Sequence, residues 1–171
     1  MTNLRSILIA SLLLAACTDP DDGADLSGDL RAARSPAGYR DVEESLTGDD
    51  FERWFELKRQ LRHDFDDICG DTFCEGDYTN LQSLSVRCSV SVATGAFKSC
   101  IWLLAGSYES VRPATGSIEV NRRFFRCTLP LAGAPQPVLE ALLAAGDTPA
   151  LQRPLPGSER SLYDALGDCL N

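Results

Sequence analysis

The sequence predicts an α+β domain in which a long N-terminal helix packs on a three- to four-stranded antiparallel meander, with short C-terminal helices and disulfide bonds. Two patterns indicate this class. Apolar residues recur at helical spacing from Phe51 to Ile68, and apolar and polar residues alternate from Leu84 to Val92. The length of 171 residues fits one folded domain, and the order of helix, strands and short helices follows the chain.

The most strongly patterned element is the expected helix from Asp50 to Ile68. Asp49 can cap its first turn, and Glu52 three residues later completes a capping-box pattern. The apolar positions form one wide face, and charged side chains occupy the other. Gly70 can adopt the left-handed conformation that often ends a helix, so we expect the chain to change direction there.

Two hairpins are expected because the sequence Ala-Thr-Gly occurs twice, at residues 93–95 and 114–116. A short hairpin loop needs a left-handed residue, which each glycine supplies. Centring the first hairpin on Thr94 predicts three cross-strand pairs: Val86 with Trp102, Leu84 with Leu104, and Cys88 with Cys100. The register and a disulfide between Cys88 and Cys100 therefore support each other.

The two later strands carry unusual apolar patterns. The run from Ile101 to Ala105 predicts a strand buried on both sides. In the strand from Ile118 to Leu129, the apolar positions change parity near Arg122 and Arg123. This change predicts a bulge or a strong twist at that point.

The C-terminal third predicts two short helices. Pro137 suits the first position of one helix, which Gly146 would close, and Ser158 can cap the other. A short terminal helix frays unless it is tied down, and Cys169 can provide the tie.

Seven cysteines less Cys17 leave six, which allow fifteen connectivities. Beside the Cys88–Cys100 pair that the register supports, elimination favours Cys69–Cys74 and Cys127–Cys169. An even number of cysteines in a small domain is typical of an oxidising compartment.

The first sixteen residues read as a signal peptide, because Arg5 precedes an apolar run from Ile7 to Leu14 that is too short to span a bilayer. The sequence Leu14-Ala15-Ala16-Cys17 resembles the lipobox of bacterial lipoproteins. The resemblance implies export, diacylglyceryl transfer to the Cys17 thiol, cleavage before Cys17 and a lipid anchor in the membrane. Thr18 follows the cysteine, which in this family's sorting pattern implies the outer membrane. The alternative is an ordinary signal peptide with Cys17 as a spare thiol.

Residues 17–48 predict an acidic, flexible tether before a single domain over residues 49–171. Residues 18–50 hold ten acidic and three basic side chains, a net charge of −7 out of −9 for the chain. With few aromatic or β-branched residues, the segment has little apolar surface to bury. An acidic docking tail is the alternative. An acidic chain is repelled by phosphate backbones, so we expect no nucleic-acid partner.

Two possible chemical sites stand out. The sequence Arg62-His63-Asp64-Phe65 resembles the His-Asp pair of secreted phospholipases A2, which implies His63 as general base and Asp64 as a calcium ligand. Separately, five residues can gather around calcium: Asp67, Asp71, Glu75, Asp77 and Asn80. The alternative for this acidic stretch is a solvated turn braced by Cys69–Cys74.

These observations predict a lipid-anchored cell-envelope lipoprotein with a small non-enzymatic binding or structural domain. Its partner would be a protein, a glycan or a small ligand. The alternative is a calcium-dependent phospholipase A2-like hydrolase that uses His63 and Asp64.

Overall fold

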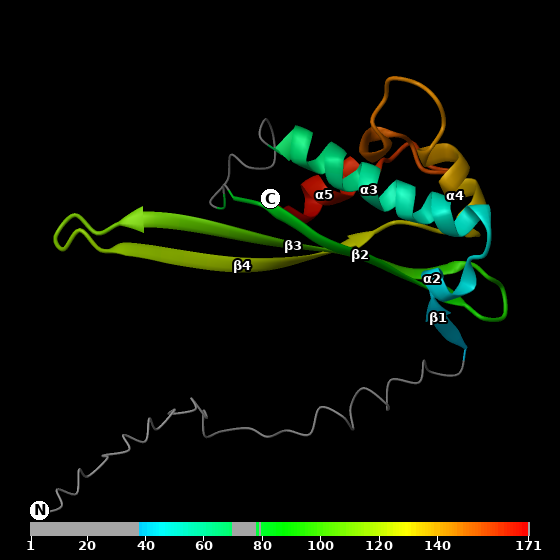
Figure 1. The fold of residues 1–171 in the computed structure, drawn as a ribbon, viewed down its shortest axis with the longest axis horizontal. Helices are drawn as coiled ribbons and strands as arrows, with labels where there is room; N and C mark the ends of the chain where they lie inside the picture. Colours follow the sequence, from blue (N-terminus) through cyan, green and yellow to red (C-terminus); the bar gives the residue numbers. More distant parts are fainter. Residues whose placement is uncertain (1–37, 70–77, 79, 171) are drawn as a thin grey trace, which may run out of the picture. The chain divides into compact units, whose positions relative to one another are not determined.

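The computed structural model describes residues 38–69, 78 and 80–170. These residues form an α+β fold whose four-stranded sheet has the antiparallel order β1-β2-β3-β4 (Figure 1). The elements in chain order are β1 (Tyr39–Asp41), α2 (Val42–Ser45), α3 (Asp49–Cys69), β2 (Gln82–Ser91), β3 (Phe97–Val111), β4 (Ile118–Leu129), α4 (Pro135–Leu142), the 3-10 helix η2 (Ala150–Gln152) and α5 (Leu162–Leu170). The α+β class and the antiparallel meander are confirmed.

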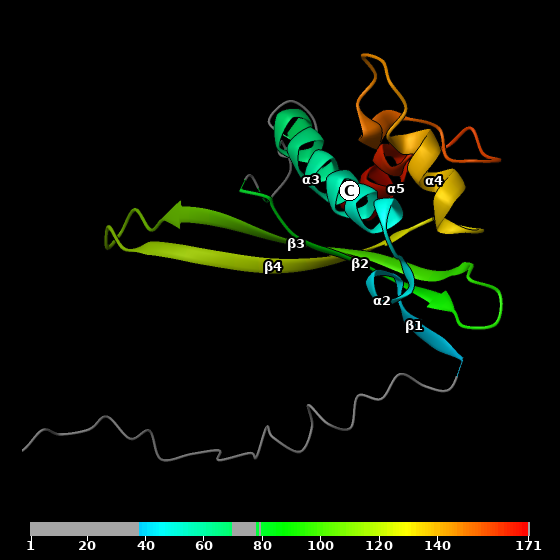
Figure 2. The ribbon, with the colours of Figure 1, turned by 45° about the vertical axis from the view of Figure 1, so that its right-hand side comes forward.

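The expected helix over 50–68 is present as α3, one residue longer at each end. Asp49 is the first residue of α3. At the helix start, the carbonyl of Gly48 accepts a hydrogen bond from the Phe51 amide (3.1 Å). The apolar face of α3 packs on the sheet, with ring centroids of Trp54 and Phe97 6.0 Å apart and those of Phe65 and Trp102 5.6 Å apart. Figure 2 shows α3 crossing over the sheet.

The first hairpin has the predicted register at two of three pairs. Val86 lies opposite Trp102 and Cys88 opposite Cys100, and Gly95 is left-handed with φ of 68°. The pairing of Leu84 with Leu104 is wrong, because an irregularity between Ser83 and Ser85 shifts the register. Leu84 is consequently exposed rather than part of the core.

The expected boundary between tether and domain at residue 48 is wrong. Residues 39–41 form the edge strand β1 along Ser89–Ser91, and Asp41 then caps α2 by accepting from the Glu43 amide (2.9 Å). Val42 and Leu46 are buried in the core. Composition did not predict that this segment is folded. Backbone hydrogen bonds to β2 hold β1 in place, and only two apolar side chains of the segment are buried.

The second hairpin differs from expectation in β4. The pairing of β3 with β4 runs without a shift from Cys100 opposite Leu129 to Val111 opposite Ile118, so the predicted bulge is wrong. Because β2 pairs with β3 only as far as Ala105, the remainder is a two-stranded ribbon (Figure 1). We call residues 106–123 the arm.

The C-terminal helices begin at different residues from those predicted. Pro135, not Pro137, opens α4, which ends at Leu142. Ser161, not Ser158, caps α5: its hydroxyl accepts from the Asp164 amide (3.2 Å), and the Asp164 carboxylate accepts from the Ser161 amide (2.7 Å). The hydrogen bonds from the Ser161 backbone and hydroxyl hold the pKa of Asp164 below its ordinary value.

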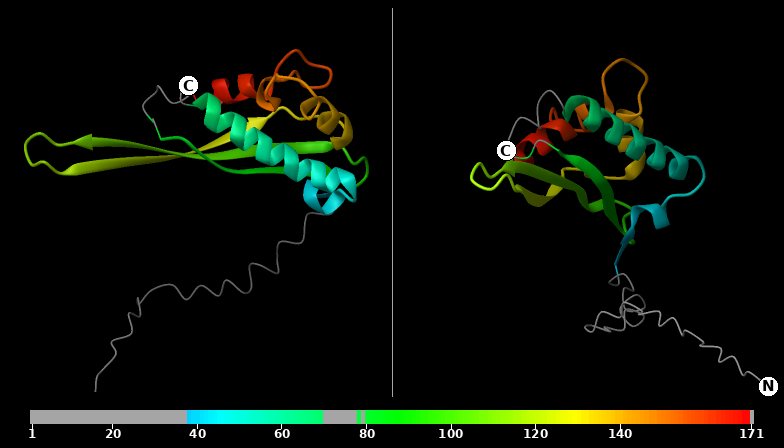
Figure 3. Two further views of the ribbon diagram at one scale, coloured as in Figure 1. Left: turned by 45° about the horizontal axis from the view of Figure 1, so that its top comes forward. Right: turned by 60° about the vertical axis from the view of Figure 1, so that its left-hand side comes forward.

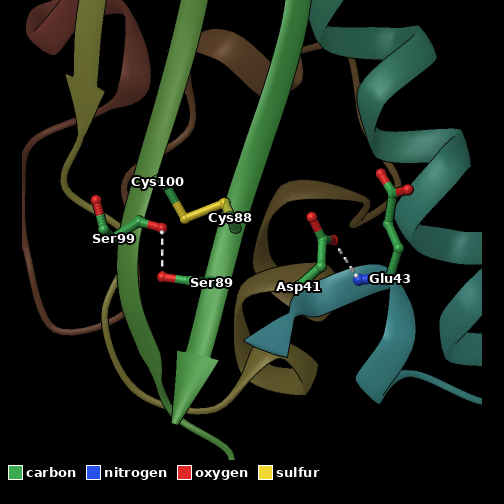
Figure 4. Close-up of a disulfide and its surroundings, with 6 residues drawn as sticks. All are labelled: Asp41, Glu43, Cys88, Ser89, Ser99 and Cys100. Atoms are coloured by element: carbon green, nitrogen blue, oxygen red, sulfur yellow. Dashed lines mark hydrogen bonds between the residues drawn. A yellow bond between two sulfur atoms is a disulfide. The ribbon is translucent and has the colours of Figure 1, made fainter. Parts of the chain in front are cut away.

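Two disulfides brace the sheet as predicted. Cys88–Cys100 joins β2 to β3, with Cα atoms 4.1 Å apart, and Figure 4 shows it between neighbouring strands. Cys127–Cys169 joins β4 to α5, with Cα atoms 5.5 Å apart. Cys74 lies outside the described residues, so Cys69–Cys74 stays a prediction.

Candidate functional site

His63 lies on the exposed side of α3. Its side chain is 73% exposed, and Nδ1 lies 3.0 Å from Oδ2 of Asp67, one helical turn further on. This pair belongs to an open groove of about 500 Å³ along α3, lined among the described residues by Phe55, Lys58, Arg59, Arg62, His63, Asp66 and Asp67. All of these residues belong to one helix.

Asp64 points to a different environment from His63. It is 9% exposed, and its Oδ2 accepts a hydrogen bond from the Leu151 amide (3.0 Å). The carboxylate thus holds η2 against α3. The two residues of the phospholipase-like pair therefore have separate partners, one at the surface and one inside the fold.

The predicted calcium ligands Asp71, Glu75 and Asp77 lie outside the described residues. Within the part of the chain that the structure describes, no group of three or more His, Cys, Asp or Glu side chains is placed to hold a metal ion.

A different feature emerges from the sheet. Figures 1 and 3 show α3, α4 and α5 on the same side of it. We call the other side the open face. Along the regular ladder of β3 and β4, alternation assigns to it the odd-numbered residues of β3 from Ile101 onward and the even-numbered residues of β4. Its apolar side chains are Ile101, Leu103, Ala105, Val111, Ile118, Val120 and Phe124.

Several of these side chains are strongly exposed. Phe124 is 75% exposed and Ile118 is 68% exposed, while Val111 and Val120 both exceed half. Large apolar groups are costly to leave in water, and their clustering on one face is typical of an interaction surface. The open face is therefore the candidate functional site.

The open face also explains the parity change in β4. Phe125, Cys127 and Leu129 are buried on the helix side, whereas Ile118 and Val120 lie on the other side of the same strand. No extra residue separates the two sets. The apolar residues change sides because the core ends near the start of the arm.

The interpretation of Ile101–Ala105 as a strand buried on both sides is correspondingly wrong. Trp102 and Leu104 are fully buried, but Leu103 is 39% exposed on the open face. The sequence did contain the signal for this surface: an apolar run suited to two covered faces and a parity change in the neighbouring strand. Only the placement of the helices shows which side the described residues leave uncovered.

Arginines flank the apolar residues of the open face. Arg122 and Arg126 lie on it, opposite Ser107 and Leu103. Arg123 lies on the helix side, with its guanidinium 4.7 Å from the ring centroid of Phe125. The β3 and β4 residues of the open face thus combine apolar side chains with these two arginines and with Glu109, which lies opposite Val120. Their net charge is positive, which favours a partner with apolar groups and carboxylates.

A polar network lies at the β1 end of the sheet. Arg87 Nη2 lies 2.6 Å from Asp41 Oδ2, and Lys58 of α3 pairs with Glu43 of α2. Burial raises the pKa of Glu43, but its hydrogen bond to Lys58 and the charges of Lys58 and Arg87 outweigh burial, so the pKa lies below its ordinary value. Asp41 and Glu43 lie close to the strands of the first hairpin (Figure 4).

A hollow of about 390 Å³ adjoins this network. Its described lining comes from β1, α2, β2 and β3: Tyr39, Arg40, Asp41, Glu44, Arg87, Cys88, Ser89, Ser99 and Ile101. Ile101 also belongs to the open face, so the hollow continues that surface toward β1.

A scan of family models, a search of curated proteins and a search of solved structures each found no match to this chain. Among the described residues, no helix has the length and apolar character needed to cross a bilayer.

Proposed function

We propose that this chain is a lipid-anchored cell-envelope lipoprotein whose α+β domain binds a protein partner on the open face and has no catalytic role. The observation that carries the binding role is the exposed apolar surface around Phe124, Val120 and Ile118, flanked by arginines. The anchor rests on the likeness of Leu14-Ala15-Ala16-Cys17 to a lipobox.

The side chains of the open face favour a protein over a small ligand. Phe124, Val120 and Arg122 lie along the single strand β4. Flat apolar surfaces with aromatic and arginine side chains are typical of protein interfaces. A partner with exposed apolar side chains beside Asp or Glu would complement both components.

The anchor is tested by metabolic labelling. Radiolabelled palmitate should be incorporated into the full chain expressed in a bacterium with a lipoprotein pathway, and Cys17→Ala should abolish incorporation. Cys69→Ala is the matched control because it also removes one cysteine, and labelling should continue. Equal labelling of Cys17→Ala and the unaltered chain would refute the anchor.

The binding surface is tested by site-specific photocrosslinking in the same cells. A p-benzoylphenylalanine in place of Phe124 should capture a specific envelope protein of defined mass. The same residue in place of Tyr108 is the control, because Tyr108 is also exposed but lies on the opposite face of the sheet. Equal capture at both positions, or none at position 124, would contradict the proposal. A product of twice the chain mass reports a second copy instead.

A further inference from the structure

Among the described residues, β4 is the long edge strand of the sheet and has no strand paired on its outer side. It is the last strand in the order β1-β2-β3-β4, and its pairing with β3 has no irregularity. The opposite edge is shorter and less regular, because β1 has three residues, β2 is irregular near Ser83, and Arg62 of α3 donates to the Leu84 carbonyl (3.3 Å). A regular exposed edge is a template for another strand unless it is protected.

Along β4, the backbone amide and carbonyl groups of successive residues point alternately toward β3 and toward the outer edge of the sheet. The Arg112 amide donates to the Ser117 carbonyl (2.8 Å) at the hairpin end, which fixes the phase of the ladder. It follows that the odd-numbered residues of β4 bond to β3. Ile118, Val120, Arg122 and Phe124 therefore direct their amides and carbonyls outward, while their side chains lie on the open face.

Charge restricts which antiparallel register two β4 strands can share. The open faces of the two copies form one side of the joined sheet only if even-numbered residues of one β4 lie opposite even-numbered residues of the other. Centring the pair on Glu119, Arg122 or Arg123 places like charges opposite each other. Centring it on Asn121 instead places Glu119 opposite Arg123 and Ile118 opposite Phe124, which are favourable cross-strand pairs.

We propose that a second copy of this chain pairs with β4 antiparallel across a two-fold axis at Asn121, extending the sheet from four strands to eight. The contact is isologous, so each favourable pair occurs twice. Glu119 already forms an ion pair with Arg112 of its own chain, and in the dimer it also faces Arg123 of the second copy.

The dimer joins the two open faces. Ile118 of one copy packs against Phe124 of the other, which removes apolar surface from water where exposure is greatest. The combined sheet presents one continuous surface to a partner. The dimer requires neither the lipid anchor nor that partner, so either can fail without affecting it.

A cysteine at the two-fold axis provides the sharpest test. In a non-hydrogen-bonded antiparallel pair the Cα atoms are about 4.5 Å apart, within the range that a disulfide spans. Purified full-length Asn121→Cys in detergent should therefore form a reducible covalent dimer on mild oxidation. The control is Tyr108→Cys, which lies opposite Asn121 on β3. Two copies of β3 are separated by three strand spacings, about 14 Å, so this variant should stay monomeric on a non-reducing gel.

Charge reversal tests the register. Glu119→Arg or Arg123→Glu alone should weaken dimerisation roughly tenfold in sedimentation equilibrium, since two cross-strand pairs become repulsive. The double variant should recover most of that loss. Arg126→Glu reverses a charge outside the paired segment and should change the dimerisation constant less than twofold.

Two results would overturn the proposal. One is a chain that stays monomeric at every concentration while circular dichroism shows an intact fold. The other is an Asn121→Cys variant that crosslinks no better than Tyr108→Cys. A dimer with unchanged affinity in both single variants, Glu119→Arg and Arg123→Glu, would place the interface elsewhere and equally refute this register.

Discussion

At the scale of single residues, buried polar side chains connect segments that are distant in sequence. Asp64 of α3 accepts from the Leu151 amide of η2 (3.0 Å). Arg153 is 8% exposed and donates to three carbonyls: Thr148 (2.8 Å), Gly146 (3.2 Å) and Ala144. These carbonyls follow the end of α4, where positive charge also complements the helix dipole.

Replacing Arg153 with Met should lower the free energy of unfolding by about 2 kcal/mol or more. The reason is that three carbonyls lose charged donors while the apolar volume is largely retained. Urea unfolding at neutral pH measures the change, and Arg59→Met, on the exposed side of α3, is the control. Equal stability of both variants would show that water replaces the guanidinium without loss.

Glu43 should make stability depend on pH. Its pKa is lower in the folded chain, so the ionised carboxylate stabilises the fold above the unfolded-state pKa of about 4.3, and this contribution is lost as pH falls through the folded value. Glu43→Gln should be less stable than the unaltered chain by about 1 kcal/mol at pH 7, and the gap should close in acid. Exposed Glu44→Gln is the control in thermal melts across pH, and a gap that persists at low pH would contradict the assignment.

At the scale of elements, the arm leaves the core at Gly106. A Cβ at this position would lie 2.9 Å from Leu81 Cδ2, 3.0 Å from Tyr78 Cβ and 3.3 Å from Phe125 Cε2. Gly106 is therefore required by close packing rather than by a left-handed turn. The next residues of the ribbon, 107–111, leave the core and are half-buried or exposed.

Gly106→Ala should destabilise the fold by about 1–3 kcal/mol, because the extra methyl group overpacks this junction. The midpoint of chemical denaturation measures the loss. Ser110→Ala, four residues along the same strand, should leave the midpoint nearly unchanged. An unchanged midpoint for Gly106→Ala would mean that Leu81 and Tyr78 can move without cost.

At the scale of the whole molecule, the buried core and the exposed arm are separate parts of one fold. The core contains α3, α4, α5 and one side of the sheet, and the disulfide Cys127–Cys169 links β4 to α5 within it. In the arm, the side chains of Val111, Ile118 and Val120 on the open face are exposed. Stability and recognition can therefore be altered independently.

Shortening the arm tests this separation. Replacing residues 109–120 with Asn-Gly would join Tyr108 to Asn121, a pair suited to a two-residue hairpin turn. The melting temperature should change by only a few degrees, because the removed side chains lie outside the buried core. Sedimentation should show loss of the dimer. A large loss of stability would show that the arm contributes to the core.

The sequence by itself determined the local elements. Helical periodicity placed α3 within one residue at each end, and the pairing of Cys88 with Cys100 followed from the turn at Gly95. These features depend on nearby residues and on strict alternation. The same patterns marked Ile101–Ala105 and the parity change in β4 as unusual, although neither pattern showed which side of the sheet would be exposed.

Only the tertiary structure decided where the helices lie and hence which side of the sheet is open. It separated His63 from Asp64, because the helix directs one side chain to solvent and the other to Leu151. It also added β1 to the domain and left Phe124 exposed on β4, the edge strand of the sheet that the described residues form. Burial depends on contacts between segments that are distant in sequence, and no local pattern specifies which of two apolar faces the rest of the chain will cover.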